Sequence, residues 1–194
     1  MLAFDTGPAN VLIDLAMRHF TDGRLAFDRN GRWAAQGHVH EALVRRWLKH
    51  PFLARRPPKS TGRELFGEPF FRRALSDAKR AHLSPCDLVA TLTAFAARSL
   101  AENYRLHLLA LPRRVILCGG GAANPVLAAS IRATLGESQP HIEISTSADH
   151  GWPLQSVEPA AFAYLAWLRA RGQPGNLPST TGARRAVLCG QITG

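Results

Sequence analysis

The sequence has few cysteines and no regular spacing of metal ligands. Cys86, Cys118 and Cys189 are its only cysteines, and no two of them form a Cys-x-x-Cys pair. Neither a disulfide framework nor a zinc site is indicated, so we expect all three thiols to be reduced and buried. The eight histidines form no pair at helical spacing, and we expect no metal site.

Long hydrophobic runs are also missing. Asp, Arg, Lys or His interrupts every apolar segment, and none reaches the roughly 18 to 20 residues that a membrane span requires. The first five residues lack the basic region, the apolar stretch and the cleavage site of a secretory leader. We therefore expect a soluble, cytoplasmic protein without membrane contact.

The composition is that of a folded domain with excess positive charge. The 194 residues are 46% hydrophobic and 20% charged, which argues against disorder and fits a single domain with a core. A formal net charge of +10 favours phosphate-rich partners where the cations cluster. Here they are scattered in short pairs such as Arg45-Arg46 and Arg113-Arg114. We expect a solvated Arg-rich surface; nucleic-acid binding is the alternative, and a salt-dependent DNA titration would test it.

Strand and helix signals alternate along the chain, which predicts an α/β fold with helices packed on a mixed or parallel sheet. Two segments read as strand, turn and helix. The first is a strand ending at 2–4 and a helix over 11–19 with Pro8 in its first turn, and the second is a strand over 114–118 and a helix over 125–135. Further helices are predicted at about 38–50, 68–81, 85–109 (with Ser84 as N-cap) and 157–171, and a further strand at 142–144.

Asp5 is the first candidate for chemistry. It lies where the first predicted strand ends and a Gly-Pro turn begins, and ligands approach open α/β sheets at the carboxyl ends of their strands. A carboxylate there can accept a proton from water or a substrate hydroxyl. The alternative is an aspartate that caps the following helix.

The turn formed by Gly119, Gly120 and Gly121 is the second candidate. Without Cβ atoms its backbone can approach a ligand closely, and the next helix begins at Asn124-Pro125 with free N–H groups. The turn has neither the spacing of a dinucleotide fingerprint nor the ending of a P-loop. A purely structural strand-to-helix turn is the alternative.

Two weaker candidates follow. Lys59, Ser60, Thr61 and Gly62 place an ammonium and two hydroxyls in one loop, which suits an anionic or polyol ligand; the alternative is an exposed polar loop. Glu158 lies in the first turn of a predicted helix. It would hold a sugar hydroxyl if it faced a cleft, and otherwise complements the helix dipole.

Together these segments resemble the anhydro-N-acetylmuramic acid kinases. The first resembling segment is Phe4-Asp5-Thr6-Gly7-Pro8-Ala9-Asn10-Val11-Leu12-Ile13-Asp14. The others follow in the same order: 27–31 with Ala34 and Gly37, 58–64, 118–122 with Asn124, Val157-Glu158 with 161–163, and 174–179 with 181–183. The resemblance spans nearly the whole sequence.

The resemblance implies an activity and a fold. The activity is an ATP-dependent kinase that opens the 1,6-anhydro ring of anhydro-N-acetylmuramate and phosphorylates O6, yielding N-acetylmuramate 6-phosphate in peptidoglycan recycling. Mg²⁺ would bridge the phosphates. The fold is similar to actin, hexokinase and the Hsp70 ATPases (ribonuclease H-like), with residues 1–194 as a single C-terminal lobe. A homodimer is also implied.

The resemblance assigns roles to the candidate residues. Asp5 would be the base that activates the water attacking the anomeric carbon. Substrate-binding positions would be Glu158, Gly7 and Asn10, and nucleotide-binding positions Gly119, Gly120, Gly121 and Asn124.

The sequence departs from the family pattern in three places. Nothing in it matches the glycine-rich Gly-Thr-Ser-x-Asp-Gly type motif that holds the ATP phosphates in an N-terminal lobe, Ala9 replaces a usual glycine, and the last residues lack a Tyr-Pro close. We therefore expect no kinase activity from this chain alone, with the N-terminal lobe absent or supplied by a separate chain. The alternatives are a sugar-binding remnant without turnover and a basic nucleic-acid-binding protein.

Overall fold

A long buried helix forms the centre of the fold. The computed structural model describes residues 1–193, in which α7 (Pro85–His107) packs against five other helices. They are α1 (Val11–Phe20), α2 (Arg32–Gln36), α3 (Glu41–Trp47), α4 (Pro51–Ala54) and α8 (Pro125–Ser138). Its start confirms the predicted cap, because the Ser84 hydroxyl accepts the Asp87 N–H at 3.1 Å and the Asp87 carboxylate accepts the Ser84 N–H at 3.1 Å. These reciprocal bonds satisfy N–H groups that the helix itself leaves free.

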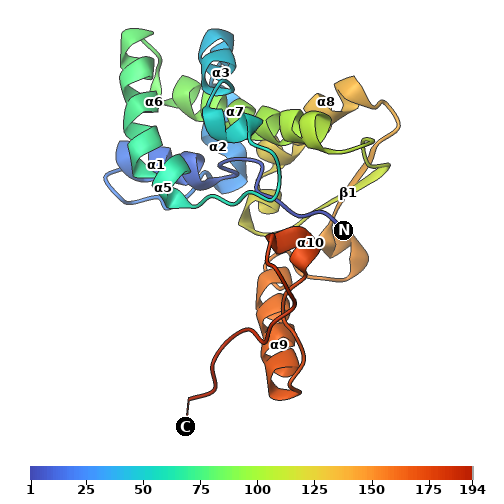
Figure 1. Ribbon diagram of the computed structural model, residues 1–194. Helices are drawn as coiled ribbons and strands as arrows, with labels where there is room; N and C mark the ends of the chain where they lie inside the picture. Colours follow the sequence, from blue (N-terminus) through green and yellow to red (C-terminus); the bar gives the residue numbers. More distant parts are fainter. Residues whose placement is uncertain (194) are drawn as a thin grey trace.

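Shorter helices from the preceding part of the chain surround α7 (Figure 1). They bury an aromatic cluster in which Phe70 stacks on Phe95 at 5.4 Å and Trp47 meets Phe95 edge-on at 5.7 Å between ring centroids. Both arrangements are favourable for aromatic pairs. The covering elements are α1 (Val11–Phe20), the 3₁₀ turn η1 (Arg29–Gly31), α2 (Arg32–Gln36), α3 (Glu41–Trp47), α4 (Pro51–Ala54), α5 (Arg63–Phe66) and α6 (Glu68–Arg80).

A small parallel sheet follows α7. Strands β1 (Arg114–Leu117) and β2 (Glu143–Thr146) pair in parallel with Val115 opposite Ile144. The connection runs through the 3₁₀ turn η2 (Gly120–Ala123) and α8 (Pro125–Ser138), and β2 is followed by η3 (Ser147–His150). A parallel pair needs such a crossover. The predicted mixed α/β class is confirmed.

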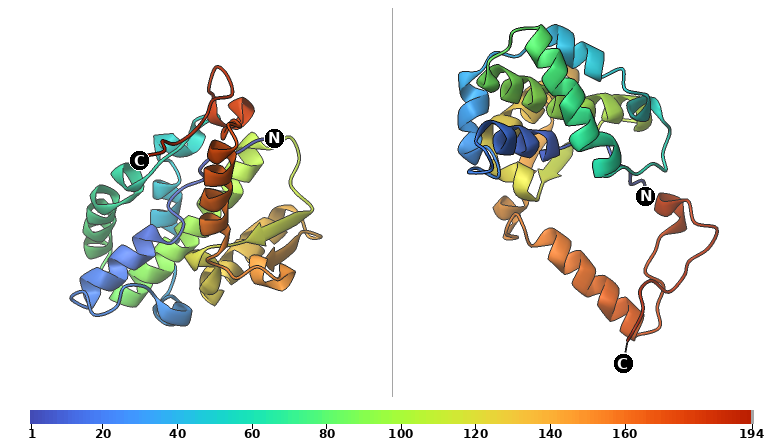
Figure 2. Two further views of the ribbon diagram at one scale, coloured as in Figure 1. Left: turned by 90° about the horizontal axis from the view of Figure 1, so that it is seen from below. Right: turned by 90° about the vertical axis from the view of Figure 1, so that its left-hand side faces the viewer.

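The C-terminal part leaves the body as an arm. Helix α9 (Val157–Ala170) points away from α7, and the chain returns to the short helix α10 (Pro178–Thr181) near the N-terminus (Figures 1 and 2). No residue of α9 is buried. The return is a close contact, because a Cβ built on Gly182 would lie 2.9 Å from Cγ of Pro58.

Several sequence-based expectations were wrong. Residues 2–4 form no strand, and Pro8 precedes α1. The helix expected over 38–50 is confined to α3, because His40 caps its start and His50 and Pro51 begin the separate helix α4. The three cysteines are free, as predicted, but none is buried: Cys118 is exposed at the strand end and the other two are half-buried.

Helices long and apolar enough to cross a bilayer do not occur within residues 1–193.

Candidate functional site

Asp5 is held by a loop that lies some 55 residues away in the sequence. Its Oδ2 accepts the Thr61 N–H at 2.7 Å and the Ser60 hydroxyl at 3.1 Å, and its backbone N–H donates to the Lys59 carbonyl at 3.1 Å. The alternative of a helix cap is wrong, because Asn10 is the N-cap residue of α1 and makes no side-chain cap bond. The carboxylate is fixed by a long-range contact.

One oxygen of this carboxylate stays available. No hydrogen bond from the described part of the chain reaches Oδ1 of Asp5, and the residue lines a pocket of about 380 Å³. A half-buried carboxylate fixed at one oxygen and open at the other is arranged to take a proton from a bound molecule. The pocket residues are Ala3, Phe4, Asp5, Pro58, Lys59, Ser60, Thr180 and Thr181.

The triple glycine turn lines a second pocket through Gly120 and Gly121. Gly119 has φ +79° and ψ −179°, a conformation essentially restricted to glycine, and its N–H donates to the Leu154 carbonyl at 2.7 Å. A Cβ built on Gly120 would meet nothing within 4 Å, whereas one on Gly121 would lie 3.3 Å from Asn10 Oδ1. The fold therefore brings Asn10 against this turn.

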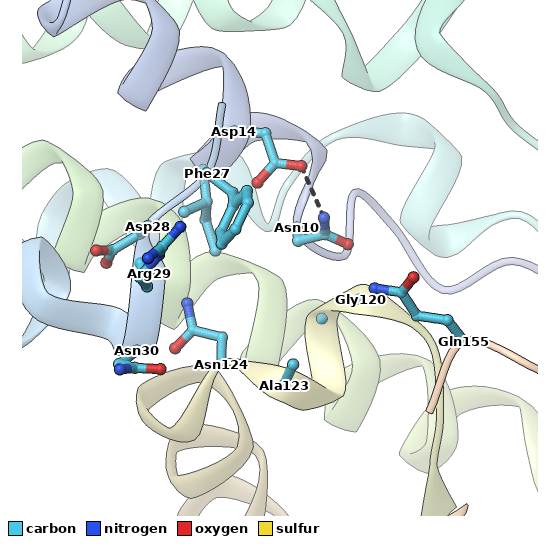
Figure 3. Close-up of a pocket in the computed structure, with 12 residues that line it drawn as sticks. Asn10, Asp14, Phe27, Asp28, Arg29, Asn30, Gly120, Ala123, Asn124 and Gln155 are labelled. Carbon is cyan, nitrogen blue, oxygen red and sulfur yellow. Dashed lines mark hydrogen bonds between the residues drawn. The ribbon is translucent and has the colours of Figure 1, made fainter. Parts of the chain in front are cut away.

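The pocket beside the turn has a volume of about 310 Å³ and mixes polar groups with an apolar wall (Figure 3). Asn10 donates from Nδ2 to Asp14 Oδ2 at 2.8 Å, and burial raises the pKa of Asp14 despite that bond and nearby arginines. The lining residues are Asn10, Ile13, Asp14, Phe27, Asp28, Arg29, Asn30, Gly120, Gly121, Ala123, Asn124 and Gln155.

Asn124 joins this pocket to the start of α8. Its Oδ1 accepts the N–H groups of Val126 and Leu127 at 3.0 and 3.1 Å. It is therefore a helix cap, and its side chain also borders the pocket. The expectation of free N–H groups at the start of α8 was wrong, because Asn124 accepts those of Val126, Leu127 and Ala128. Only the positive end of the helix dipole favours an anion there.

A smaller pocket lies between the glycine turn and the segment that follows Asp5. With a volume of about 210 Å³, it is lined by Thr6, Ala9 and Asn10 from the Asp5 segment and by Gly119, Gly120 and Gly121 from the turn. The segment that carries Asp5 thus runs along the glycine turn, and residues far apart in sequence share one side of the molecule.

Two predicted site residues are placed differently. Gly7 has φ +142°, and a Cβ there would lie 2.6 Å from Ser99 Oγ of α7, so that close packing already accounts for this glycine. Glu158 lies in the first turn of the exposed helix α9 and lines neither the Asp5 pocket nor the glycine-turn pocket. The structure does not bring Glu158 together with Asp5.

The pockets also contain residues that sequence reasoning did not single out. Asp14, Phe27 and Gln155 line the glycine-turn pocket, and Thr180 and Thr181 line the Asp5 pocket. Asp14, Phe27 and Thr181 lie inside the resembling segments, which is the signal that could have found them. Nothing local marks Gln155.

Residues 1–193 contain no group of three or more His, Cys, Asp or Glu side chains that could hold a metal ion.

Comparison with known proteins gives one consistent family. A family model described as anhydro-N-acetylmuramic acid kinase matches residues 1–194. Proteins named anhydro-N-acetylmuramic acid kinase from Cyanothece sp. (strain PCC 7425 / ATCC 29141), Picosynechococcus sp. (strain ATCC 27264 / PCC 7002 / PR-6) and Synechocystis sp. (strain ATCC 27184 / PCC 6803 / Kazusa) are 46%, 44% and 45% identical to this chain. The matches cover 97%, 99% and 97% of this chain and 49%, 50% and 48% of those proteins. The chain spans about half the length of these curated relatives.

Proposed function

Because the chain belongs to the anhydro-N-acetylmuramic acid kinase family, we propose that it contributes the catalytic carboxylate and the nucleotide-side turn of an ATP-dependent sugar kinase. The substrate is anhydro-N-acetylmuramate and the product is N-acetylmuramate 6-phosphate. The observation that carries the proposal is the Asp5 carboxylate, fixed through Oδ2 by Ser60 and Thr61 beside a pocket.

In the proposed reaction Asp5 acts as a general base. Its Oδ1 takes a proton from a water molecule whose oxygen bonds to the anomeric carbon, and the bond between that carbon and O6 breaks. The released O6 then attacks the γ-phosphorus of ATP, and ADP leaves. Asp5 holds the water's proton at the end of the sequence, so that atoms and charges balance. The hydroxyl-bearing residues of the same pocket, Ser60, Thr180 and Thr181, would contact a polyol.

ATP is assigned to the glycine-turn pocket. Gly120 leaves open space there, and the positive end of the α8 dipole lies beside the turn. Gly119, Gly121 and Asn124 would shape the phosphate side, with Asn10 between nucleotide and sugar. Mg²⁺ would accompany ATP, but the described residues offer no ligand cluster for it, and no step is assigned to it.

The finer architecture is part of the proposal. Residues 1–194 would form the C-terminal lobe of an actin- and hexokinase-like kinase, with the phosphate-holding lobe supplied outside these residues. The resemblance of the segments and the half-length match to the relatives support this arrangement. Glu158, Gly7 and a homodimer remain assignments from the resemblance, and the cytoplasm is the proposed location.

The proposal is tested by sugar phosphorylation with the purified chain, alone and mixed with the remaining half of the Cyanothece relative. We expect ATP-dependent N-acetylmuramate 6-phosphate only in the mixture. Asp5→Asn should lower its rate by about 10²- to 10⁴-fold, the usual contribution of a general base. The matched control is Asp22→Asn, at an exposed turn position with φ +49°. Activity of Asp5→Asn equal to that of Asp22→Asn, or no product from any mixture, would contradict the proposal.

A further inference from the structure

Lys59 is buried, with an exposed fraction of 5%. The other two lysines of the chain, Lys49 and Lys79, are exposed. The Lys59 ammonium donates to the carbonyls of Phe52 at 3.2 Å and Leu53 at 3.0 Å, and to Oδ1 of Asn103. It also lies 4.9 Å from the ring centroid of Phe52. Three acceptors match the three donors of an ammonium group.

Asn103 extends these contacts to the Asp5 segment. It is fully buried on α7, and its Nδ2 donates to the carbonyls of Thr6 at 3.1 Å and Ser99 at 2.9 Å. One amide side chain therefore ties together the Lys59 ammonium, the central helix and the residue after Asp5. Buried polar networks that are fully satisfied hold a single arrangement.

The arrangement is costly, which suggests a use for it. Among the described residues no carboxylate forms an ion pair with Lys59, whose polar neighbours are two carbonyls, the Asn103 amide and Nε2 of His107 at 3.4 Å. Burial together with the Arg55 charge lowers the pKa of Lys59, while the Asp5 charge opposes that shift. Taking an ammonium out of water without an ion-pair partner is unfavourable. A neutral side chain of similar size would fill the same space without the free-energy cost of desolvating a charge.

Lys59 begins the loop that binds Asp5. The Lys59 carbonyl accepts the Asp5 N–H, and the next two residues donate to the Asp5 carboxylate. We propose that Lys59, fastened by Asn103 and the end of α4, is a positioning residue: it fixes the loop 59–61 so that one oxygen of Asp5 is occupied and the other is left open to the pocket. The catalytic value of this arrangement rests on the proposed function; the positioning itself does not.

The positioning is tested without any enzymatic reaction by amide hydrogen exchange in the 194-residue chain. The Thr61 amide reports on the Asp5 carboxylate because it donates to it. Loss of a hydrogen bond to a charged group corresponds to about 10- to 100-fold faster exchange. We expect that acceleration at Thr61 in Lys59→Met and in Asp5→Ala, and none in Lys49→Met, the matched removal of an exposed ammonium. Amides in the middle of α7 should keep their protection and show that the variants are folded.

Thr61 protection in a folded Lys59→Met variant that equals the wild-type value would overturn the proposal. If Lys59→Met does not fold, the wild-type chain provides the test. The Asp5 and Thr61 amides should then exchange through one shared opening reaction, with the same opening rate constant and the same dependence on urea. Independent opening of Thr61 would overturn the proposal.

An activity readout separates positioning from general stability. In a mixture that phosphorylates the sugar, Lys59→Met should lower kcat by about 100-fold, the effect of a small misplacement of a catalytic group, and leave the KM for ATP unchanged. Equal losses in kcat and in ATP binding would contradict the proposal. If exchange behaves as expected but no mixture is active, the proposed function fails and the positioning stands.

Discussion

Ala9 occupies a backbone conformation that its side chain disfavours. Its φ is +44°, in the left-handed region, at the position where the family pattern has glycine. Such a conformation costs a residue with a Cβ about 1–2 kcal/mol, and glycine avoids the cost but loses more chain entropy on folding. The sequence and its resemblance already marked this position, and the structure explains why.

Ala9→Gly should therefore stabilise the protein. The expected increase in the free energy of unfolding is about 0.5–1 kcal/mol, the difference between the strain relieved and the entropy lost. Urea denaturation followed by circular dichroism measures it. The control is Ala101→Gly, a substitution inside α7, which should destabilise because glycine is unfavourable within helices. Destabilisation by Ala9→Gly would show that φ at this position is not the strained value described.

Gly120 and Gly119 should respond differently to alanine. A Cβ on Gly120 meets no atom within 4 Å but enters the glycine-turn pocket, whereas Gly119 has φ +79°. We expect Gly120→Ala to keep the unfolding free energy within about 0.5 kcal/mol and to weaken ATP binding measured by calorimetry. Gly119→Ala should cost about 1–3 kcal/mol through backbone strain. Unchanged ATP affinity in Gly120→Ala would place the nucleotide elsewhere.

The cap of α7 gives the stability a dependence on pH. The Ser84 hydroxyl and the His38 N–H donate to Asp87 and lower its pKa from 3.8 to about 2. Because the folded state favours the charged carboxylate, this contribution is complete above pH 4 and is lost as the pH falls toward 2. Asp87→Asn should flatten that part of the stability profile in urea titrations. An unchanged slope between these pH values would refute the assignment.

The central helix α7 is buried by packing, whereas helix α9 of the C-terminal arm has no buried residue. Phe95 on α7 is 0% exposed and Phe162 on α9 is 66% exposed. Phe95→Ala should cost about 3–5 kcal/mol, whereas Phe162→Ser should change the unfolding free energy by less than about 0.5 kcal/mol. It should also raise solubility, since it removes an exposed aromatic group. A large loss of stability in Phe162→Ser would mean that α9 packs against the body.

Helices were predictable where local signals are strong. The cap at Ser84 and the periodic apolar residues placed α7 within two residues of its observed end, and α6 and α9 were placed within one residue of theirs. The strand expected at 2–4 is absent because it has no partner in residues 1–193, and pairing is a long-range property. The short helices α4, α5 and α10 have four residues each, too few for periodicity to show.

In the candidate site, too, local features were predictable from the sequence and long-range contacts were not. The sequence marked Asp5, Asn10 and the glycine turn, and the fold brings Asn10 onto that turn. It could not show that Ser60 and Thr61 hold the Asp5 carboxylate, or that Lys59 is buried with protein acceptors. The bonds of Ser60 and Thr61 to Asp5, and that of Lys59 to Asn103, join segments more than 40 residues apart in sequence, which no local pattern encodes.

At the scale of the whole molecule, one N-terminal segment of chain borders both pockets. Residues 3–5 line the Asp5 pocket, and Asn10 lines the glycine-turn pocket. The proposed function assigns the sugar to the first pocket and the nucleotide to the second, at the two ends of this segment. The arm returns through α10 to complete the first pocket with Thr180 and Thr181.

Titration of the isotope-labelled chain with anhydro-N-acetylmuramate, followed by nuclear magnetic resonance, tests the central assignment directly. Saturable shifts of the Thr61, Thr180 and Thr181 amides, abolished in Asp5→Ala and retained in Asp22→Asn, are the predicted result. Shifts confined to the glycine-turn residues 119–124, or the same response in Asp5→Ala, would show that the sugar does not bind at Asp5.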